Sequence, residues 1–400
     1  MTTLLKEIAD TAAFAHYIEQ GYISERVNEY DADLFVYSYT PKSQFSGFWT
    51  PETRLARGLI LRKTDGFDTA EVVGRGLPKF FTVEQAESDW GKAKLVDDDE
   101  GVTVSEDVVL PWDDEAHVAD KMNGALILAY RDPFGFVAGS TKGSFGSPEA
   151  GIATRILSER FDAEKSKRFF EITDGQTALF EIITPERQHP VDYGNTEDLF
   201  FLGTVRISDG FWTPATDDHA LVTELGFTLA ESGEHKTLRE AVMAPYRENT
   251  EGFVVTTNVE DTQYLYKVKP AEYIALRKAF YALESNDLSV LLAGKTGTEY
   301  LAVDSETFEF PAGTRNVEEK RDALKMNFIV PFRAEMESVM DSYKSVRGTG
   351  DLPDRKTFAE AVKTSGVNGT FLFAAYADEE NGTDRLARLV ATGIIKSFKK

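Results

Sequence analysis

Short runs of apolar and β-branched residues dominate the chain from about residue 34 to residue 270. Turn residues bound most of these runs, which is typical of strands. The predicted strands are LFVYSYT at 34–40, RGLILRK at 57–63, ALILAYR at 125–131, FGFVAGST at 134–141, ALFEII at 178–183, FFLGTVRI at 200–207, EGFVVTT at 251–257 and QYLYKVK at 263–269. Helical patterns at 3–20, 148–164 and 236–246 interrupt them without regular alternation. This order predicts an α+β fold and not a doubly wound sheet.

Beyond about residue 280 the pattern changes to helical periodicity. Apolar residues recur at spacings of three and four within 318–346, 357–365 and 385–398. A chain of 400 residues is also longer than one core usually fills. We therefore predict a first domain at 1–278 and a mostly α-helical C-terminal domain at 279–400.

The composition narrows the possible chemistry. The chain has no cysteine, which excludes disulfides, thiolate catalysis and Cys-based zinc sites. A cation that prefers oxygen ligands is the expected metal. Lys6, Glu7 and Asp10 interrupt the apolar residues near the N-terminus, and no apolar run reaches membrane-spanning length. These features predict a cytoplasmic protein without a membrane partner.

The formal charge of -23 is unfavourable for binding to a nucleic acid. The acidity is regional, however. Residues 315–400 hold 15 basic and 13 acidic residues, a net +2, which leaves -25 for residues 1–314. An acidic surface is also a common solubilising feature, so charge alone does not decide the partner.

Three lysines are followed by glycine three residues later, in KTDG at 63–66, KMNG at 121–124 and KTSG at 363–366. Lys63 follows its predicted strand, and its Asp-Gly is typical of a turn between strands. Lys363 lies in a predicted helix near the C-terminus. Lys121 instead precedes a strand, with an Asn-Gly turn that holds the side chain at the strand's start. Position therefore favours Lys121 as a reactive lysine.

Four charged residues downstream strengthen this choice. Lys267 and Lys269 stand two positions apart on a predicted strand, so both project from one face, as two contacts to one polyphosphate require. Glu181 lies within a strand, and Glu251 opens a strand after a polar turn. Each residue alone is compatible with a solvated surface position. The order and spacing of the set carry the hypothesis.

These segments together resemble the phage-type RNA ligases of the RNA ligase 1 family, within the covalent nucleotidyltransferases that include DNA ligases and capping enzymes. The resemblance covers most of residues 50–275. Its segments are ARGLIL with Arg57, GLPKFFTVEQ with Lys79 and Phe81, KMNG with Lys121 and Gly124, STKGS with Lys142, LFEII with Glu181, EGFVV with Glu251 and Gly252, and YKVKPAEY with Lys267, Lys269 and Tyr273. One departure is Asn123, which stands where the family motif usually has Asp.

The resemblance implies a nucleotidyltransferase domain of the ATP-grasp-like ligase type, with antiparallel sheets and a helical appendage. It implies ATP as the nucleotide and Mg²⁺ as the metal, with Mn²⁺ as the alternative. Lys121 would attack the α-phosphate of ATP, AMP would pass to the 5'-phosphate of an RNA, and a 3'-hydroxyl would then displace AMP. Attack requires the neutral amine, which burial and neighbouring cations favour.

The same resemblance assigns roles to the other motif residues. Arg57 and Lys79 would hold the β- and γ-phosphates, although Arg57 could instead pair with Glu52 or Asp65. The remaining ATP contacts would come from Gly124, Lys142, Glu181, Lys267 and Lys269. Lys142 could instead contact the substrate, or STKGS could be only a turn. Glu251 and Glu181 would place the metal, and Glu181 could also bind the ribose. Phe81, or else Phe200 or Phe201, could stack on a base.

Three alternatives remain open at this stage. The same fold could perform capping-type guanylyl transfer or DNA ligation, or it could bind RNA without catalysis. The helical C-terminal domain would help to recognise RNA, such as single-stranded ends or a broken tRNA anticodon loop, or would only stabilise the first domain. A role in RNA repair would couple the enzyme to a polynucleotide kinase-phosphatase.

Overall fold

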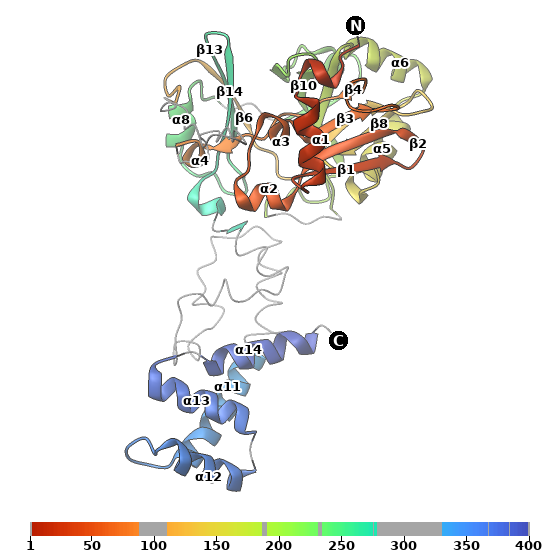
Figure 1. Cartoon of the computed structure of the whole chain (residues 1–400). Coiled ribbons are helices and arrows are strands. Elements are labelled where there is room, and N and C mark those ends of the chain that lie inside the picture. Colours follow the sequence, from red (N-terminus) through yellow and green to blue (C-terminus); the bar gives the residue numbers. More distant parts are fainter. Residues whose placement is uncertain are drawn as a thin grey trace, which may run out of the picture. The chain divides into compact units, whose positions relative to one another are not determined.

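The computed structural model describes residues 2–87, 110–185, 190–230, 234–274, 276–277, 330–366, 368–383 and 385–398 (Figure 1). The chain forms two compact units, Met1–Pro270 and Ala271–Lys400. The predicted domain boundary at 278/279 lies outside the described residues.

The first sheet of unit 1 is antiparallel in the order β1-β2-β3-β4. Its strands are β1 (Ile23–Asn28), β2 (Asp31–Tyr39), β3 (Arg57–Arg62) and β4 (Glu71–Gly74). The predicted helix at 3–20 is wrong in extent, because a 3-10 turn at Leu5–Glu7 ends before α1 (Thr11–Glu19) begins. The break falls at Asp10, whose carboxylate accepts hydrogen bonds from the backbone of Ala12 and Ala13 and so caps α1.

The second sheet has the order β11-β10-β9-β7-β8, and β12 pairs in parallel with β10. Its strands are β7 (Ala125–Arg131), β8 (Val137–Thr141), β9 (Gln176–Ile183), β10 (Asp198–Arg206), β11 (Trp212–Pro214) and β12 (Thr228–Leu229). The predicted helix at 148–164 is confirmed as α5 (Pro148–Arg160), but its predicted end is wrong, because a second helix, α6 (Ala163–Ile172), begins within the predicted range. Asp162 accepts a hydrogen bond from the Lys165 backbone and starts α6, so the chain bends after Phe161.

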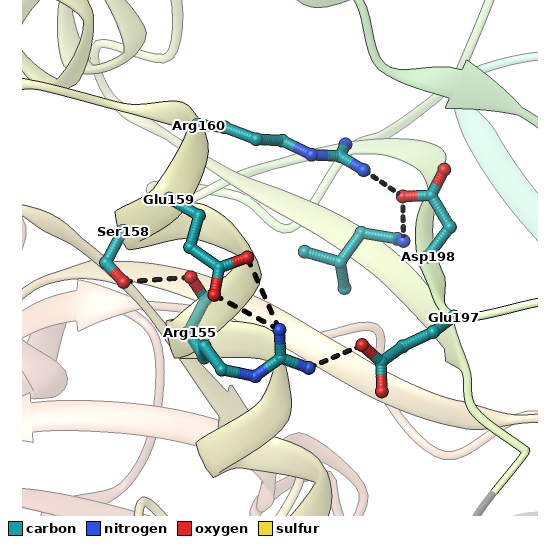
Figure 2. Close-up of polar contacts among 7 residues, drawn as sticks. Arg155, Ser158, Glu159, Arg160, Glu197 and Asp198 are labelled. Carbon is teal, nitrogen blue, oxygen red and sulfur yellow. Dashed lines mark hydrogen bonds and ion pairs between the residues drawn. The ribbon is translucent and has the colours of Figure 1, made fainter.

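Two ion pairs fasten α5 to the beginning of β10 (Figure 2). Arg155 contacts both Glu159 on its own helix and Glu197, while Arg160 contacts Asp198. A buried cluster beneath them, with Ile127 and Phe180 among its members, seals α5 and α6 onto the sheet. These contacts fix the position of α5, whose N-terminal end follows the STKGS segment that contains Lys142.

The third sheet has the order β5-β14-β13-β6, with β5 parallel to β14 and the other pairs antiparallel. Its strands are β5 (Phe81–Thr82), β6 (Ala116–Asp120), β13 (Phe253–Val259) and β14 (Thr262–Val268). Short helices α4 (Val83–Glu87) and α8 (Leu238–Met243) lie beside it. Most predicted strands are confirmed, but β1, β4 and β6 were not predicted, since exposed polar residues interrupt β1, β4 has only four residues, and β6 has only one buried residue.

The first two sheets pack against each other through one buried cluster. Leu34, Val36 and Ile60 come from the first sheet, and Leu128 and Leu179 come from the second. The predicted α+β class with antiparallel sheets is confirmed.

In unit 2 the described residues from 330 onward form α11 (Val330–Arg347), α12 (Arg355–Ser365), α13 (Gly369–Asn381) and α14 (Arg385–Phe398). Their apolar faces share a core around Phe358. The helical character is confirmed, although α13 was not expected, since its apolar residues follow no single face. None of the described helices is both long and apolar enough to cross a membrane.

Candidate active site

A cavity of about 740 Å³ opens in unit 1, and residues of all three sheets line it. Its polar wall includes Tyr39, Arg57, Lys121, Gly124, Lys142, Glu181 and Lys267. Its apolar wall includes Leu77, Phe80, Leu126, Phe201, Leu202, Trp212, Pro214 and Val254. Pockets that combine an apolar wall with a few converging polar groups are the usual form of a ligand site.

Lys121 lies between β6 and β7, where the chain passes from the third sheet to the second. Its backbone N–H donates to the carbonyl of Gly252 at 2.8 Å. Its Nζ forms an ion pair with Glu251 Oε1 at 2.9 Å, and Lys269 Nζ binds the same oxygen at 2.7 Å. Burial by itself raises the pKa of Glu251, but Lys121 and Lys269 together lower it. Three of the residues predicted from widely separated segments therefore meet at one oxygen atom.

Gly124 closes the lysine loop against β9. Its N–H donates to Glu181 Oε1 at 2.9 Å. A Cβ at this position would lie 2.2 Å from the carbonyl oxygen of Ile182, so only glycine fits. Burial raises the pKa of Glu181 to about 7, although Lys121 and the Gly124 N–H act in the opposite direction.

Arg57 and Lys267 hold the segment that forms the cavity's aromatic wall. Lys267 Nζ donates to the carbonyl of Phe80 at 3.0 Å and lies 4.2 Å from the ring centroid. Arg57 donates to the carbonyl of Leu77 at 3.1 Å. Among the described residues, no ion pair joins Arg57 to an acid such as Glu52. Burial lowers the pKa of Lys267 well below its usual value, and Arg57 and other cations add to the effect.

Lys79 and Phe81 lie behind this wall and are absent from the cavity lining. Lys79 Nζ faces the rings of Trp49 and Phe81 at 5.1 and 5.3 Å from their centroids, and it donates to Gln44 at 3.2 Å. Burial lowers its pKa, and Arg57 lowers it further. Phe80, one position before the residue singled out in the sequence, lines the cavity, as does Phe201, whereas Phe200 is absent from the lining.

Tyr39 is a cavity residue that sequence reasoning missed. The ammonium of Lys142 lies 4.8 Å from its ring centroid. Burial raises the pKa of the Tyr39 phenol, but Lys142, Arg57 and Lys79 outweigh burial and lower it. No motif in its strand, β2, points to this role, because only tertiary packing brings the three cations around the ring.

Tyr193 was also missed, since it lies in a loop without a recognisable motif. Its hydroxyl accepts a hydrogen bond of 2.8 Å from the backbone N–H of Asn123 in the lysine loop. The neighbouring Asp192 exchanges two backbone–side-chain hydrogen bonds with Asn249, of 2.7 and 2.8 Å. Asn249 has a φ of 59°, a left-handed conformation that asparagine tolerates. These contacts join the lysine loop to the loop that precedes Glu251.

The other two KxxG lysines lie elsewhere. Lys63 follows β3, as predicted, and forms an ion pair of 2.6 Å with Glu25. Its ammonium also lies 4.5 Å from the ring centroids of Phe35 and Phe67. Lys363 lies within α12 of unit 2. Neither residue lines the cavity around Lys121.

The carboxylates near Lys121 suffice for one or two of the ligands of a magnesium ion, but not for its whole ligand shell. Among the residues that the structure describes, no group of three or more Asp, Glu or His side chains is arranged to hold a metal. Mg²⁺ commonly takes one or two protein carboxylates and completes its shell with water and substrate phosphates. Glu181 in the cavity wall and Glu251 beneath Lys121 provide such a pair.

Comparison with known proteins assigns the family. A family model described as RNA ligase, of the T4 type, matches residues 55–273, which is more than half of the chain. A sequence search of curated proteins finds no match.

Among solved structures, an archaeal ATP-dependent RNA ligase has 14% identity and a TM-score of 0.45, and the match covers 89% of this chain and 86% of that one. A putative ATP-dependent DNA ligase from Aquifex aeolicus has 11% identity and a TM-score of 0.40, and the match covers 93% of this chain and 81% of that one. A Naegleria gruberi RNA ligase with ATP and Mn has 10% identity and a TM-score of 0.31, and the match covers 39% of this chain and 50% of that one.

These TM-scores are too low to choose between RNA and DNA ligases, so the family match carries the assignment. It spans the cavity residues Arg57, Lys121, Glu181 and Lys267. The chain therefore belongs to the T4-type RNA ligase family.

Proposed function

We propose that Lys121 is the residue that this ligase adenylylates, and that the AMP then activates a 5'-phosphate of RNA for joining to a 3'-hydroxyl. One observation carries the proposal: Lys121 lines the cavity and shares Glu251 with Lys269, while Glu181 and Lys267 line the same space. Lys121 Nζ attacks the α-phosphorus of ATP, the bond to the bridging oxygen breaks, and pyrophosphate leaves.

The cations of the site bind and neutralise the triphosphate. Arg57, Lys142 and Lys267 face the cavity and can contact phosphate oxygens directly. Lys79 adds positive potential from behind the wall, and Lys269 keeps Glu251 in place beside Lys121. Fixed charges in a buried site stabilise developing negative charge without reorganising during the reaction. The apolar wall with Phe80 and Trp212 suits the adenine base.

Mg²⁺, with Mn²⁺ as the alternative, would be held by Glu251 and Glu181. Glu251 is the stronger candidate because Lys121 and Lys269 lower its pKa and keep it charged, whereas burial raises the pKa of Glu181 to about 7. Glu181 faces the cavity, where it would reach a ribose hydroxyl or a metal-bound water. A bound Mg²⁺ would supply additional positive charge for the phosphates.

The biological task that fits best is RNA repair, including the repair of a broken tRNA anticodon loop after a kinase-phosphatase has prepared the ends. Support comes from the charge distribution. Residues 315–400, at +2, repel a polyanion less than residues 1–314, at -25. The helices of unit 2 are accordingly the proposed RNA-recognition module.

The test is covalent labelling with Mg²⁺ and ATP that carries ³²P at the α-phosphate. The wild-type protein should acquire label, Lys121→Ala should acquire none, and Lys63→Ala, the matched control, should label normally. A labelled Lys121→Ala protein beside an unlabelled Lys63→Ala protein would overturn the assignment. Labelling by GTP in place of ATP would indicate capping chemistry. Sealing of nicked duplex DNA but not of single-stranded RNA would indicate a DNA ligase.

A further inference from the structure

The nucleotide chemistry leaves one group of cavity-lining residues without a role. Besides Lys142, which it uses, the cavity is lined by Ser24 and Arg26 of β1, Ser38 of β2, the loop residues Gly143, Ser144 and Ser147, and Glu149 in the first turn of α5. Ser24 and Arg26 are two positions apart on one strand and project from the same face. The family match begins only at residue 55, so β1 lies outside it.

Arg26 differs from the other cavity arginine in its exposure. Arg57 is half-buried and tied to the Leu77 carbonyl, whereas the Arg26 side chain is exposed. Within the described ranges, neither Arg26 nor Lys142 forms an ion pair with a carboxylate. Arg62, in the same sheet as Arg26, does form an ion pair, with Asp31 at 2.8 Å. A chain with 67 acidic and 44 basic residues offers many such partners, so two cavity-facing cations without one mark a site for an external anion.

The position of Arg26 favours RNA over ATP as the source of that anion. Arg57, Lys267 and Lys121 already provide cavity cations, and all three are half-buried. A polynucleotide must enter from solvent, because its chain continues beyond the terminal phosphate. Exposed arginine and lysine side chains are the common contacts to such phosphates. The exposed Arg26 in the cavity wall is therefore better placed for an RNA end than for a buried nucleotide.

We propose that Arg26 and Lys142 form the entry site for the 5'-phosphate end of RNA, an inference that rests on the proposed function of Lys121. Lys142 adjoins Tyr39 in the cavity wall, and its neighbour Gly143 lies against Ser38, which pairs with Ser24 on the strand that carries Arg26. In the step concerned, an oxygen of the RNA 5'-phosphate attacks the α-phosphorus of lysyl-AMP and forms a phosphoanhydride. The phosphorus–nitrogen bond breaks, and its electron pair remains on Lys121 Nζ, which takes up a proton.

The test separates the two steps in the full-length protein. Lysine labelling by ATP should change by less than about twofold in Arg26→Ala, because the nucleotide site is intact. Transfer of AMP from labelled protein to 5'-phosphorylated RNA should slow by about tenfold or more at low RNA concentration and recover at high concentration. The slope of the logarithm of RNA affinity against the logarithm of salt concentration should fall by about one, as expected for the loss of one phosphate contact. Arg26→Lys should restore part of the rate. Arg62→Ala is the matched control and should match wild type in both steps.

Two results would overturn the proposal. If Arg26→Ala raises the KM for ATP in the labelling step, the site serves the nucleotide. If it equals Arg62→Ala in both steps, the site serves neither ligand. Thermal melting of both variants separates these results from misfolding. If the wild-type protein does not label with ATP, the proposed function of Lys121 is refuted. This result differs from a failure of the Arg26 proposal, in which the wild-type protein still labels.

Discussion

Lys121 and Lys63 have closely similar immediate surroundings. Each precedes a glycine by three residues, each pairs with a glutamate, at 2.9 and 2.6 Å, and their side chains are 20% and 19% exposed. They differ in what lies beyond the ion pair. The Lys63 ammonium lies against the rings of Phe35 and Tyr37 in β2 and of Phe67 in the loop after β3, whereas Lys121 lines the cavity together with Glu181 and Lys267. An ion pair and partial burial are therefore common to both lysines, and only Lys121 has space for a substrate beside it.

The acid partners of the two lysines give the largest expected contrast. Glu251→Ala should reduce the rate of lysine labelling by about 100-fold or more, since it removes the anion that positions both Lys121 and Lys269. Glu25→Ala should leave the rate within about threefold, because Glu25 bonds to Lys63 and Tyr37 and projects from the face of β1 opposite to the cavity residues Ser24 and Arg26. Single-turnover labelling with saturating ATP measures both. Equal losses in the two variants would remove the distinction between the lysines.

The glycines of the two motifs should differ next. Gly124→Ala forces a Cβ against the Ile182 carbonyl, so it should displace the lysine loop and slow labelling by about tenfold to 100-fold. Gly66 has a φ of 141° but open space around a Cβ. Gly66→Ala should therefore cost about 1 kcal/mol of stability and leave labelling unchanged. Labelling rates and denaturant unfolding of the two variants check this, and a normal rate in Gly124→Ala would contradict it.

Two tyrosine hydroxyls provide a finer comparison. Tyr193→Phe removes the acceptor of the Asn123 N–H, so kcat for labelling should fall by about tenfold while the KM for ATP stays constant. Tyr37→Phe removes the hydroxyl that donates to Glu25 beside Lys63, and it should affect unfolding only. If Tyr193→Phe changes stability but not kcat, its hydroxyl has no positioning role.

The smallest expected effect is a pH dependence of stability. Burial raises the pKa of Glu251, yet Lys121 and Lys269 outweigh it, so its pKa is lower folded than unfolded. Such a carboxylate stabilises the fold above its unfolded pKa of about 4.3, and this contribution disappears as the pH falls through the folded pKa. The stability difference between wild type and Glu251→Gln should therefore shrink in acid. Thermal melting from pH 7 down to pH 3 tests this, and a difference that grows in acid would reverse the sign.

The sequence determined the secondary structure wherever one pattern ran without interruption. The strands β7, β9 and β14 were predictable because their apolar runs end at clear turns. Asp10 and Asp162 were read as ordinary helix residues, although each caps a new helix. Capping depends on the backbone direction before the cap, which a single residue type does not specify.

The sequence by itself also predicted candidate site residues that lie together in the fold. Order and spacing select Lys121, Glu251 and Lys269, and both lysines bind the same oxygen of Glu251. Only the tertiary structure decided which residues of each segment face the cavity. It placed Phe80 in the lining and Lys79 with Phe81 behind it, and it brought Tyr39 and Tyr193 to the site. The physical reason is that spacing fixes the faces of one strand, whereas a cavity forms between sheets whose relative packing depends on contacts far apart in the chain.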